Sequence, residues 1–147
     1  MNRKIHLLTS SIIVVLTIIL FATGSPLLTI SVLGIPFGNL LLWLGFVALH
    51  LFFYKLNHNY QTNTSKIGKS IKLLATFLLI ISILWFIIAY VLSGNVGFNF
   101  SGAVSSYLGS PRASILFWNI IYVLTISPFI LSLLYTIIRY IEYRKNR

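Results

Sequence analysis

The sequence predicts an all-α integral membrane protein: a four-helix transmembrane bundle with both termini in the cytoplasm and two extracytoplasmic loops that are uncharged apart from Arg112. Three observations predict this fold. Hydrophobic residues make up 58% of the 147 residues and charged residues only 8%, whereas a soluble domain carries about 25% charged residues. Four apolar segments approach the roughly 20 residues that cross a bilayer as a helix. Of the 11 Lys and Arg residues, all but Arg112 fall on one side of the predicted membrane.

The whole chain, residues 1–147, is expected to form a single polytopic membrane domain. The first apolar segment follows a basic start and ends at Ala22-Thr23-Gly24, so a cleaved secretory signal is the alternative to a retained helix. The first two segments are short for a span, which local thinning of the bilayer tolerates. We expect helices at about residues 5–22, 40–56, 71–92 and 115–138.

Three connections join these helices. Residues 57–70 are polar and basic and form a cytoplasmic linker, and residues 24–37 and 94–112 form the outer loops. Both outer loops contain a stretch in which apolar and polar residues alternate, which is the pattern of a half-buried strand. The sequence therefore predicts either a cap in which the two outer loops pair or two unpaired loops at the membrane interface.

The charge distribution predicts the topology. Lys and Arg collect in the cytoplasmic loops of membrane proteins, and four crossings place the start, the linker and the tail of the chain on the same side. We therefore expect a multi-pass plasma-membrane protein whose cytoplasmic face attracts anionic lipid. Because topology accounts for the basic composition, no nucleic acid partner is expected. Abundant Ile, Asn and Lys favour a bacterial source.

Small residues recur every seven positions, which is close to two helical turns and places each set on one face of a helix. Small residues let membrane helices approach closely where no hydrophobic force drives association. The spacing predicts a left-handed bundle with these stripes turned inward, the alternative being chance. The helix-packing seam consists of Ser10, Thr17, Gly38, Gly45, Ala75, Ser82, Ala89, Thr125 and Ser132.

Two further residues lie inside predicted helices. Pro128 removes one backbone hydrogen bond and frees the carbonyl of Leu124, so we expect a static kink, with a hinge as the alternative; Thr125 or Ser127 could satisfy that carbonyl. His50 is expected to donate a hydrogen bond between helices or to act as a pH-sensitive switch.

Polar residues near the outer helix ends form a second candidate site. A lone outer cation could hold a lipid phosphate, a substrate or an ion, or could simply be solvated. The residues of this outer polar site are Arg112, Asn119, Asn39 and Asn99.

Missing residue types limit the chemistry. Cysteine and aspartate are absent and Glu142 is the only carboxylate, so thiolate nucleophiles, iron–sulfur clusters and two-carboxylate hydrolysis are excluded. We expect no metal site and no cofactor, because hard cations need several oxygen ligands and the three histidines show no ligand spacing. Coupled transport is disfavoured because such carriers place an acid inside the membrane.

One local string resembles a known family. The residues around Ser101, from Phe100 to Gly109, resemble the Gly-x-Ser-Gly motif of rhomboid intramembrane proteases, and the residues around His50 resemble their His-bearing second helix. The resemblance implies that Ser101 is a nucleophile. Asn99 stands in place of the first Gly, no histidine follows Ser101, and the family has six core helices instead of four.

These observations favour a non-enzymatic small membrane protein that acts through protein or lipid partners. It would be an accessory subunit of a larger membrane machine or an immunity-type protein, with a protein partner or a homo-oligomer expected. One alternative is a small oligomeric channel or facilitator for the transport of a solute or anion. Another is a membrane-embedded enzyme that acts on lipid or peptide through Ser101 or His50.

Overall fold

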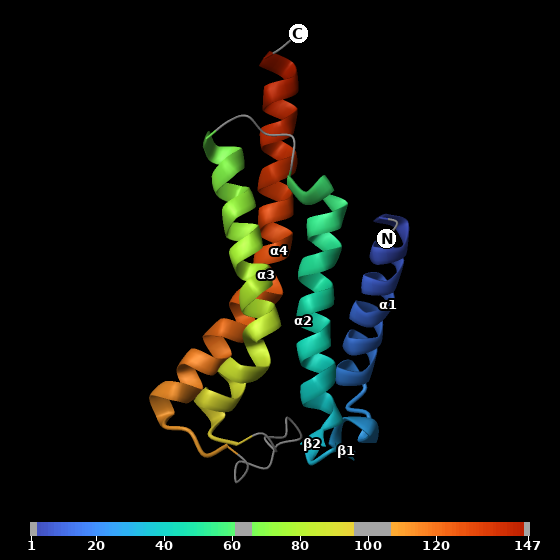
Figure 1. Cartoon of the computed structure of the whole chain (residues 1–147), viewed down its shortest axis with the longest axis vertical. Helices are drawn as coiled ribbons and strands as arrows, with labels where there is room; N and C mark the ends of the chain where they lie inside the picture. The colour runs from blue at the N-terminus through green and yellow to red at the C-terminus, as the bar shows by residue number, and fades with distance from the viewer. Residues whose placement is uncertain (1–2, 61–65, 96–106, 146–147) are drawn as a thin grey trace.

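Four long helices dominate the structure, a computed structural model that describes residues 3–60, 66–95 and 107–145. The four-helix, all-α prediction is confirmed, and each helix is long and apolar enough to cross a membrane. The helices are α1 (Arg3–Ala22), α2 (Phe37–Leu56), α3 (Lys66–Ser93) and α4 (Pro111–Lys145), as Figure 1 shows.

The helices extend beyond the apolar segments of the sequence. α3 begins at Lys66 and α4 ends at Lys145, because Lys, Arg and Ser continue a helix after its apolar stretch has ended. The polar linker is therefore shorter than residues 57–70. α4 begins at Pro111, whose fixed φ suits the first helical turn, and the Ser110 hydroxyl accepts a hydrogen bond from the Ala113 amide at 3.2 Å.

The first outer loop contains a small hairpin. After the 3₁₀ helix η1 (Pro26–Thr29), strand β1 (Ser31–Val32) pairs antiparallel with β2 (Ile35–Pro36). The two turn residues, Leu33 and Gly34, have φ of 53° and 82°, as a tight two-residue hairpin requires. The pairing described here is therefore within one loop. The second alternating stretch, residues 96–101, lies outside the described residues.

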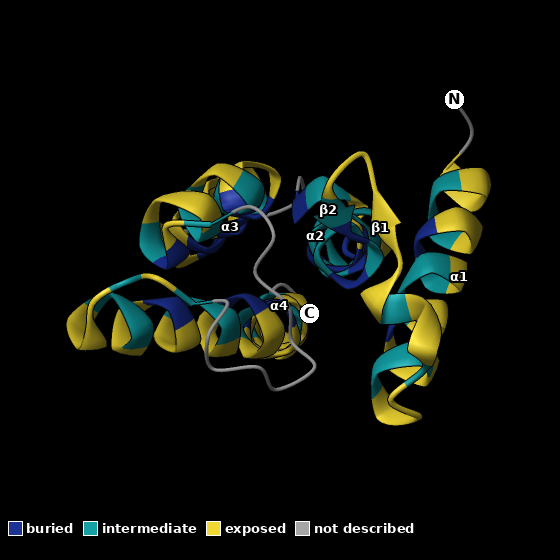
Figure 2. Ribbon diagram, turned by 90° about the horizontal axis from the view of Figure 1, so that it is seen from below, coloured by how far each residue is buried: buried dark blue, intermediate teal, exposed yellow. Residues whose placement is uncertain are grey.

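The helices are not arranged symmetrically. α2, α3 and α4 pack against one another, whereas α1 packs against α2 and η1. Figure 2 shows α1 on the opposite side of α2 from α3 and α4. The exterior of the whole assembly is rich in exposed Leu, Ile and Val side chains, which is the surface expected of a protein surrounded by lipid.

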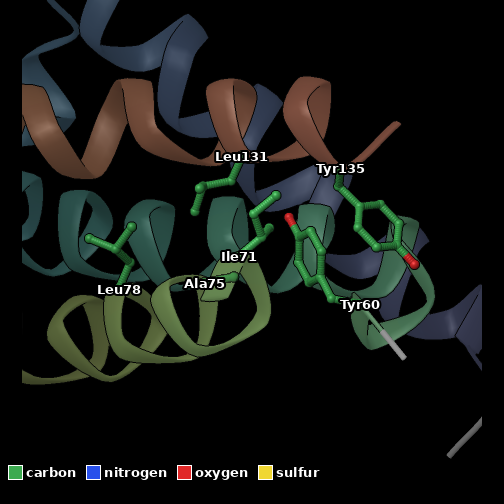
Figure 3. Packing of buried hydrophobic residues seen from close by; sticks show 6 residues of the cluster. All are labelled: Tyr60, Ile71, Ala75, Leu78, Leu131 and Tyr135. Carbon is green, nitrogen blue, oxygen red and sulfur yellow. The ribbon is translucent and has the colours of Figure 1, made fainter. Parts of the chain in front are cut away.

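Two hydrophobic clusters hold α2, α3 and α4 together. The first surrounds the buried ring of Tyr135 and is drawn in Figure 3. In the second, the Trp85 ring lies 5.6 Å from Phe46 and 5.2 Å from Phe117 between ring centroids. Aromatic pairs of this kind contribute about 0.5–1.5 kcal/mol each beyond their buried area. The members of the two clusters are Tyr60, Ile71, Ala75, Leu78, Leu131 and Tyr135, and Phe46, Trp85, Phe117 and Leu124.

α4 changes direction along its length, as Figure 1 shows. Pro128 lies inside this helix and is buried, and an interior proline bends a helix because it lacks an amide hydrogen and its ring clashes with the preceding turn. The Thr125 hydroxyl donates to the carbonyl of Ile121 at 2.8 Å. It therefore does not serve the carbonyl of Leu124, as the sequence had suggested that it could.

Candidate functional site

An apolar groove between α1, α2 and α4 could receive another molecule. Its volume is about 340 Å³, roughly twice the ~150 Å³ of an engineered apolar cavity that binds benzene. The groove is lined by Val14, Thr17, Ile18 and Phe21 of α1, Leu42, Gly45, Phe46 and Leu49 of α2, and Thr125 and Phe129 of α4.

The α1–α2 wall of the groove depends on one close contact between two small residues. A Cβ atom added to Gly45 would lie 2.9 Å from Cγ2 and 3.0 Å from Oγ1 of Thr17, so only glycine fits at this separation. Thr17 is itself held in place, because its hydroxyl donates to the carbonyl of Ile13 at 2.8 Å. The pair fixes the distance between the two helices at mid-height.

The bent helix α4 forms the third wall of the groove. Thr125 and Phe129 lie on either side of Pro128 in the sequence and both line the groove. The Phe129 ring also packs against Phe53 of α2, with centroids 4.7 Å apart. The hydroxyl hydrogens of Thr17 and Thr125 are both committed to carbonyls of their own helices, so the groove offers hydrocarbon surface to an occupant.

A polar link joins α2 to α4 just inside the aromatic pair. The amide nitrogen of Asn57 donates to the Ser132 hydroxyl at 3.0 Å and to the Tyr60 hydroxyl at 3.1 Å. Asn57 was missed because the sequence placed it in the solvated linker. An asparagine directly after an apolar helix is a recognised C-cap residue, and that pattern could have identified it.

The turn after α2 has an unusual backbone. The 3₁₀ segment η2 (His58–Tyr60) has φ of 51°, 56° and 53° at His58, Asn59 and Tyr60. Left-handed conformations cost non-glycine residues about 1–2 kcal/mol each, so other contacts must hold the turn. Tyr60 supplies them: its ring is buried, with its centroid 4.8 Å from that of Tyr135, and burial raises the pKa of its phenol to about 12.

His50 is buried between the helices, but it does not form the interhelical bond that the sequence predicted. Its Nδ1 lies 2.9 Å from the carbonyl of Phe46, one turn back in α2. A carbonyl only accepts, so Nδ1 carries the hydrogen and Nε2 is the acceptor of the neutral ring. Nε2 has no hydrogen-bond partner among the described residues. The sequence predicted that the ring N–H of His50 would bond to another helix. In the structure this N–H donates to the carbonyl of Phe46 in the same helix.

The seam residues occupy different environments. Ser10 and Thr17 of α1, Gly38 and Gly45 of α2, and Ala75 and Ser82 of α3 are buried, Ala89 and Ser132 are half-buried, and Thr125 is exposed. Gly38 faces η1 instead of a long helix, because an added Cβ would lie 3.1 Å from the carbonyl oxygen of Leu28. The seven-residue spacing thus includes two positions of close approach, Gly38 and Gly45, and also Thr125, which is exposed instead of turned inward.

The outer polar residues are not gathered into one site. Arg112 and Asn119 are exposed in the first turns of α4, and Asn39 is half-buried at the start of α2. Figures 1 and 2 both place the beginning of α4 apart from the beginning of α2. Asn99, and Ser101 of the rhomboid-like string, lie outside the described residues.

A further basic residue was not singled out from the sequence. The Arg3 guanidinium donates to the carbonyls of Lys55 and Leu56 at 3.0 and 3.2 Å, and a cation is favourable at the carboxyl end of a helix. Within residues 3–60, 66–95 and 107–145, no group of three or more His, Cys, Asp or Glu side chains is placed to hold a metal ion.

Comparison of the chain with protein-family models, with curated proteins and with solved structures finds no match.

Proposed function

We propose that this chain is a multi-pass plasma-membrane protein, with both termini in the cytoplasm, that acts by binding a partner within the bilayer. The observation that carries the proposal is the apolar groove of about 340 Å³ between α1, α2 and α4. A concave apolar surface is the usual form of a binding site, and this one lies between three helices that can each cross a membrane.

The placement of charge supports the orientation. Figure 1 shows the start of α1, the end of α2, the start of α3 and the end of α4 at one end of the molecule. Lys55 lies in the last turn of α2, and Arg144 and Lys145 lie in the last turn of α4. At the other end, the loop residues 24–37 are uncharged and Arg112 lies in the first turn of α4. Cations mark the cytoplasmic side, so the end that carries Lys55, Arg144 and Lys145 faces the cytoplasm in the proposed topology.

The groove is accessible to partners because α1 is attached along one side only. Accessory subunits and immunity-type proteins both act by occupying or covering a surface of another membrane component. α1 and the groove provide such a surface without requiring a charged group in the hydrocarbon region, where charges are costly. We assign the chain to this class of binding protein, with the partner bound along the α1–α2–α4 face.

Two experiments test the proposal. The chain contains no cysteine, so single-cysteine variants report topology directly. A membrane-impermeant maleimide should label Thr29→Cys but not Lys69→Cys in intact cells, and the opposite pattern would overturn the orientation.

The second experiment tests partner binding. A photoreactive amino acid at Ile18, which is exposed beside the groove, should form adducts in native membranes. The same group at Ile83, on the exposed surface of α3, is the control. Equal cross-linking at both positions would contradict binding along the groove.

A further inference from the structure

We infer that the turn of the β1–β2 hairpin, Leu33 and Gly34, inserts into the outer interface of the bilayer and binds the lipids there through the Leu33 side chain. The inference rests on the orientation given in the proposed function and adds a second contact, with lipid instead of a protein partner. It follows from the conformation and exposure of Leu33, the composition of its loop, and the lengths of α1 and α2.

Leu33 occupies a position that the fold alone does not explain. Its φ of 53° is left-handed, a conformation that strains residues with a side chain, and Asn, Asp or Gly usually occupies this place in a two-residue turn. The Leu33 side chain is 98% exposed, so packing inside the protein does not offset the strain. Strained residues persist where a function requires them. Leu33 therefore makes its contact outside the chain.

The composition of the loop favours lipid as the other side of this contact. Residues 24–37 contain no charged residue, and the exposed side chains of this loop include Leu27, Ile30 and Val32. Apolar side chains gain free energy when they leave water. A stable protein interface buries about 800 Å² on each partner, which a turn of two residues cannot offer. Insertion among lipids needs neither that area nor a matching shape.

The lengths of α1 and α2 place the hairpin at the depth of the lipid headgroups. From Lys4 to Ala22 in α1, and from Phe37 to Lys55 in α2, each helix rises about 27 Å. The Arg3 guanidinium donates to the carbonyl of Lys55 at 3.0 Å, which joins the cytoplasmic ends of the two helices. The hydrocarbon core is about 30 Å thick, and its cytoplasmic side holds the lysines. Both outer helix ends therefore lie at or just inside the outer boundary of the core.

The hairpin is too short to leave the interface. The Phe37 amide donates to the carbonyl of Ile30 at 2.8 Å, so the hairpin closes directly on the first residue of α2. Three residues separate Phe37 from Gly34, a reach of about 10 Å at most. Figures 1 and 2 show the hairpin beside the beginning of α2, with its exposed turn at the edge of the molecule. Because each headgroup layer is about 5–8 Å thick, a turn directed sideways stays within it.

The test uses the full-length protein, which contains no cysteine, in phosphatidylcholine–phosphatidylglycerol vesicles. A bimane fluorophore is attached to Leu33→Cys or, as the water-exposed control, to Lys145→Cys at the end of α4. With iodide on both sides of the membrane, quenching at Leu33→Cys should be at least about threefold weaker than at Lys145→Cys. A nitroxide near the headgroup end of a lipid acyl chain should quench Leu33→Cys but not Lys145→Cys. Equal quenching by iodide at the two positions would overturn the inference.

A second set of variants tests the leucine itself. With the fluorophore on Val32→Cys, Leu33→Asn should raise quenching by iodide about twofold, because asparagine suits a left-handed backbone but is polar. Leu33→Met is the matched apolar control and should leave quenching unchanged. The same quenching in both variants would contradict insertion through Leu33.

Two outcomes separate this inference from the proposed function. Shielding of Leu33→Cys in native membranes but not in vesicles would show that a protein covers the turn, which overturns the inference and leaves the proposed function standing. Maleimide labelling of Lys69→Cys instead of Thr29→Cys in intact cells would overturn the orientation and the inference together.

Discussion

Replacing Gly45 by Ala tests the close contact on which the α1–α2 interface depends. Alanine is favoured over glycine inside a helix by about 1 kcal/mol, so without the contact the substitution would stabilise the protein. In this structure the new methyl group would lie 2.9 Å from Cγ2 of Thr17. Overpacking of this kind costs about 1–3 kcal/mol.

Thr17 cannot relieve the clash easily. A β-branched side chain has few χ1 rotamers in a helix, and the present one is held by a 2.8 Å hydrogen bond to the carbonyl of Ile13. We therefore take the upper part of the overpacking range. A cost of about 2–3 kcal/mol less the ~1 kcal/mol gained from helix propensity leaves a net loss of about 1–2 kcal/mol for Gly45→Ala.

The sign of the effect should reverse when Thr17 is shortened. In a Thr17→Ala background, Gly45→Ala meets no Cγ2 or Oγ1 atom and keeps only the contact with Cβ of residue 17 at 3.3 Å. It should then stabilise by up to about 1 kcal/mol. The two measurements give a coupling energy of about 2–3 kcal/mol. The assay is unfolding of the purified protein in mixed micelles by increasing dodecyl sulfate, followed by circular dichroism. Equal stabilisation by Gly45→Ala in both backgrounds would refute the close approach of α1 to α2.

Three further substitutions or titrations follow from the structure. Asn57→Leu should cost about 1–3 kcal/mol in the same unfolding assay, because it leaves Ser132 and Tyr60 without their shared donor; a loss no larger than that of the exposed control Asn119→Leu would contradict this. The phenol of Tyr60 should titrate near its raised pKa of about 12 in ultraviolet difference spectra. The unfolded phenol ionises near pH 10. The contribution of the protonated Tyr60 phenol to the free energy of unfolding is therefore fully present below pH 10 and is lost as the pH rises through 12. A free energy of unfolding that stays constant between pH 10 and 12 argues against burial of Tyr60. His50→Leu should leave thermal stability unchanged or raise it by up to about 1 kcal/mol, since it removes a buried nitrogen that has no partner among the described residues, and a large loss would show that this nitrogen is bonded.

Long apolar segments made the four helices predictable, because a stretch of about 20 apolar residues has few other stable arrangements. The helix ends were less predictable. Lys66 and Lys69 extend α3 although they are charged, since a helix can leave the hydrocarbon region and continue in water. The hairpin turn at Leu33 and Gly34 lies within a stretch whose alternation indicated strands, but alternation does not identify the partner strand.

The groove could not be predicted from the chain alone. The spacing of Thr17 and Gly45 placed both residues on inward faces, but it contained no information on which helices would meet there. The turn at His58 and Asn59 has a left-handed backbone, but it contains no glycine from which the sequence could have predicted that conformation. It exists because Tyr60 is buried against Tyr135, a contact between residues 75 positions apart. Local sequence patterns do not contain tertiary contacts of this kind.

The confinement of cations to the helix ends has a consequence for how the protein responds to voltage. Residues 7–22, 37–54, 73–93 and 113–138 contain no Lys, Arg, Asp or Glu. A membrane potential does about 2.3 kcal/mol of work per 100 mV for each unit charge that crosses the bilayer. In the proposed topology, a displacement of α1 from α2 moves no charge through that field. A membrane potential therefore does no work on such a displacement.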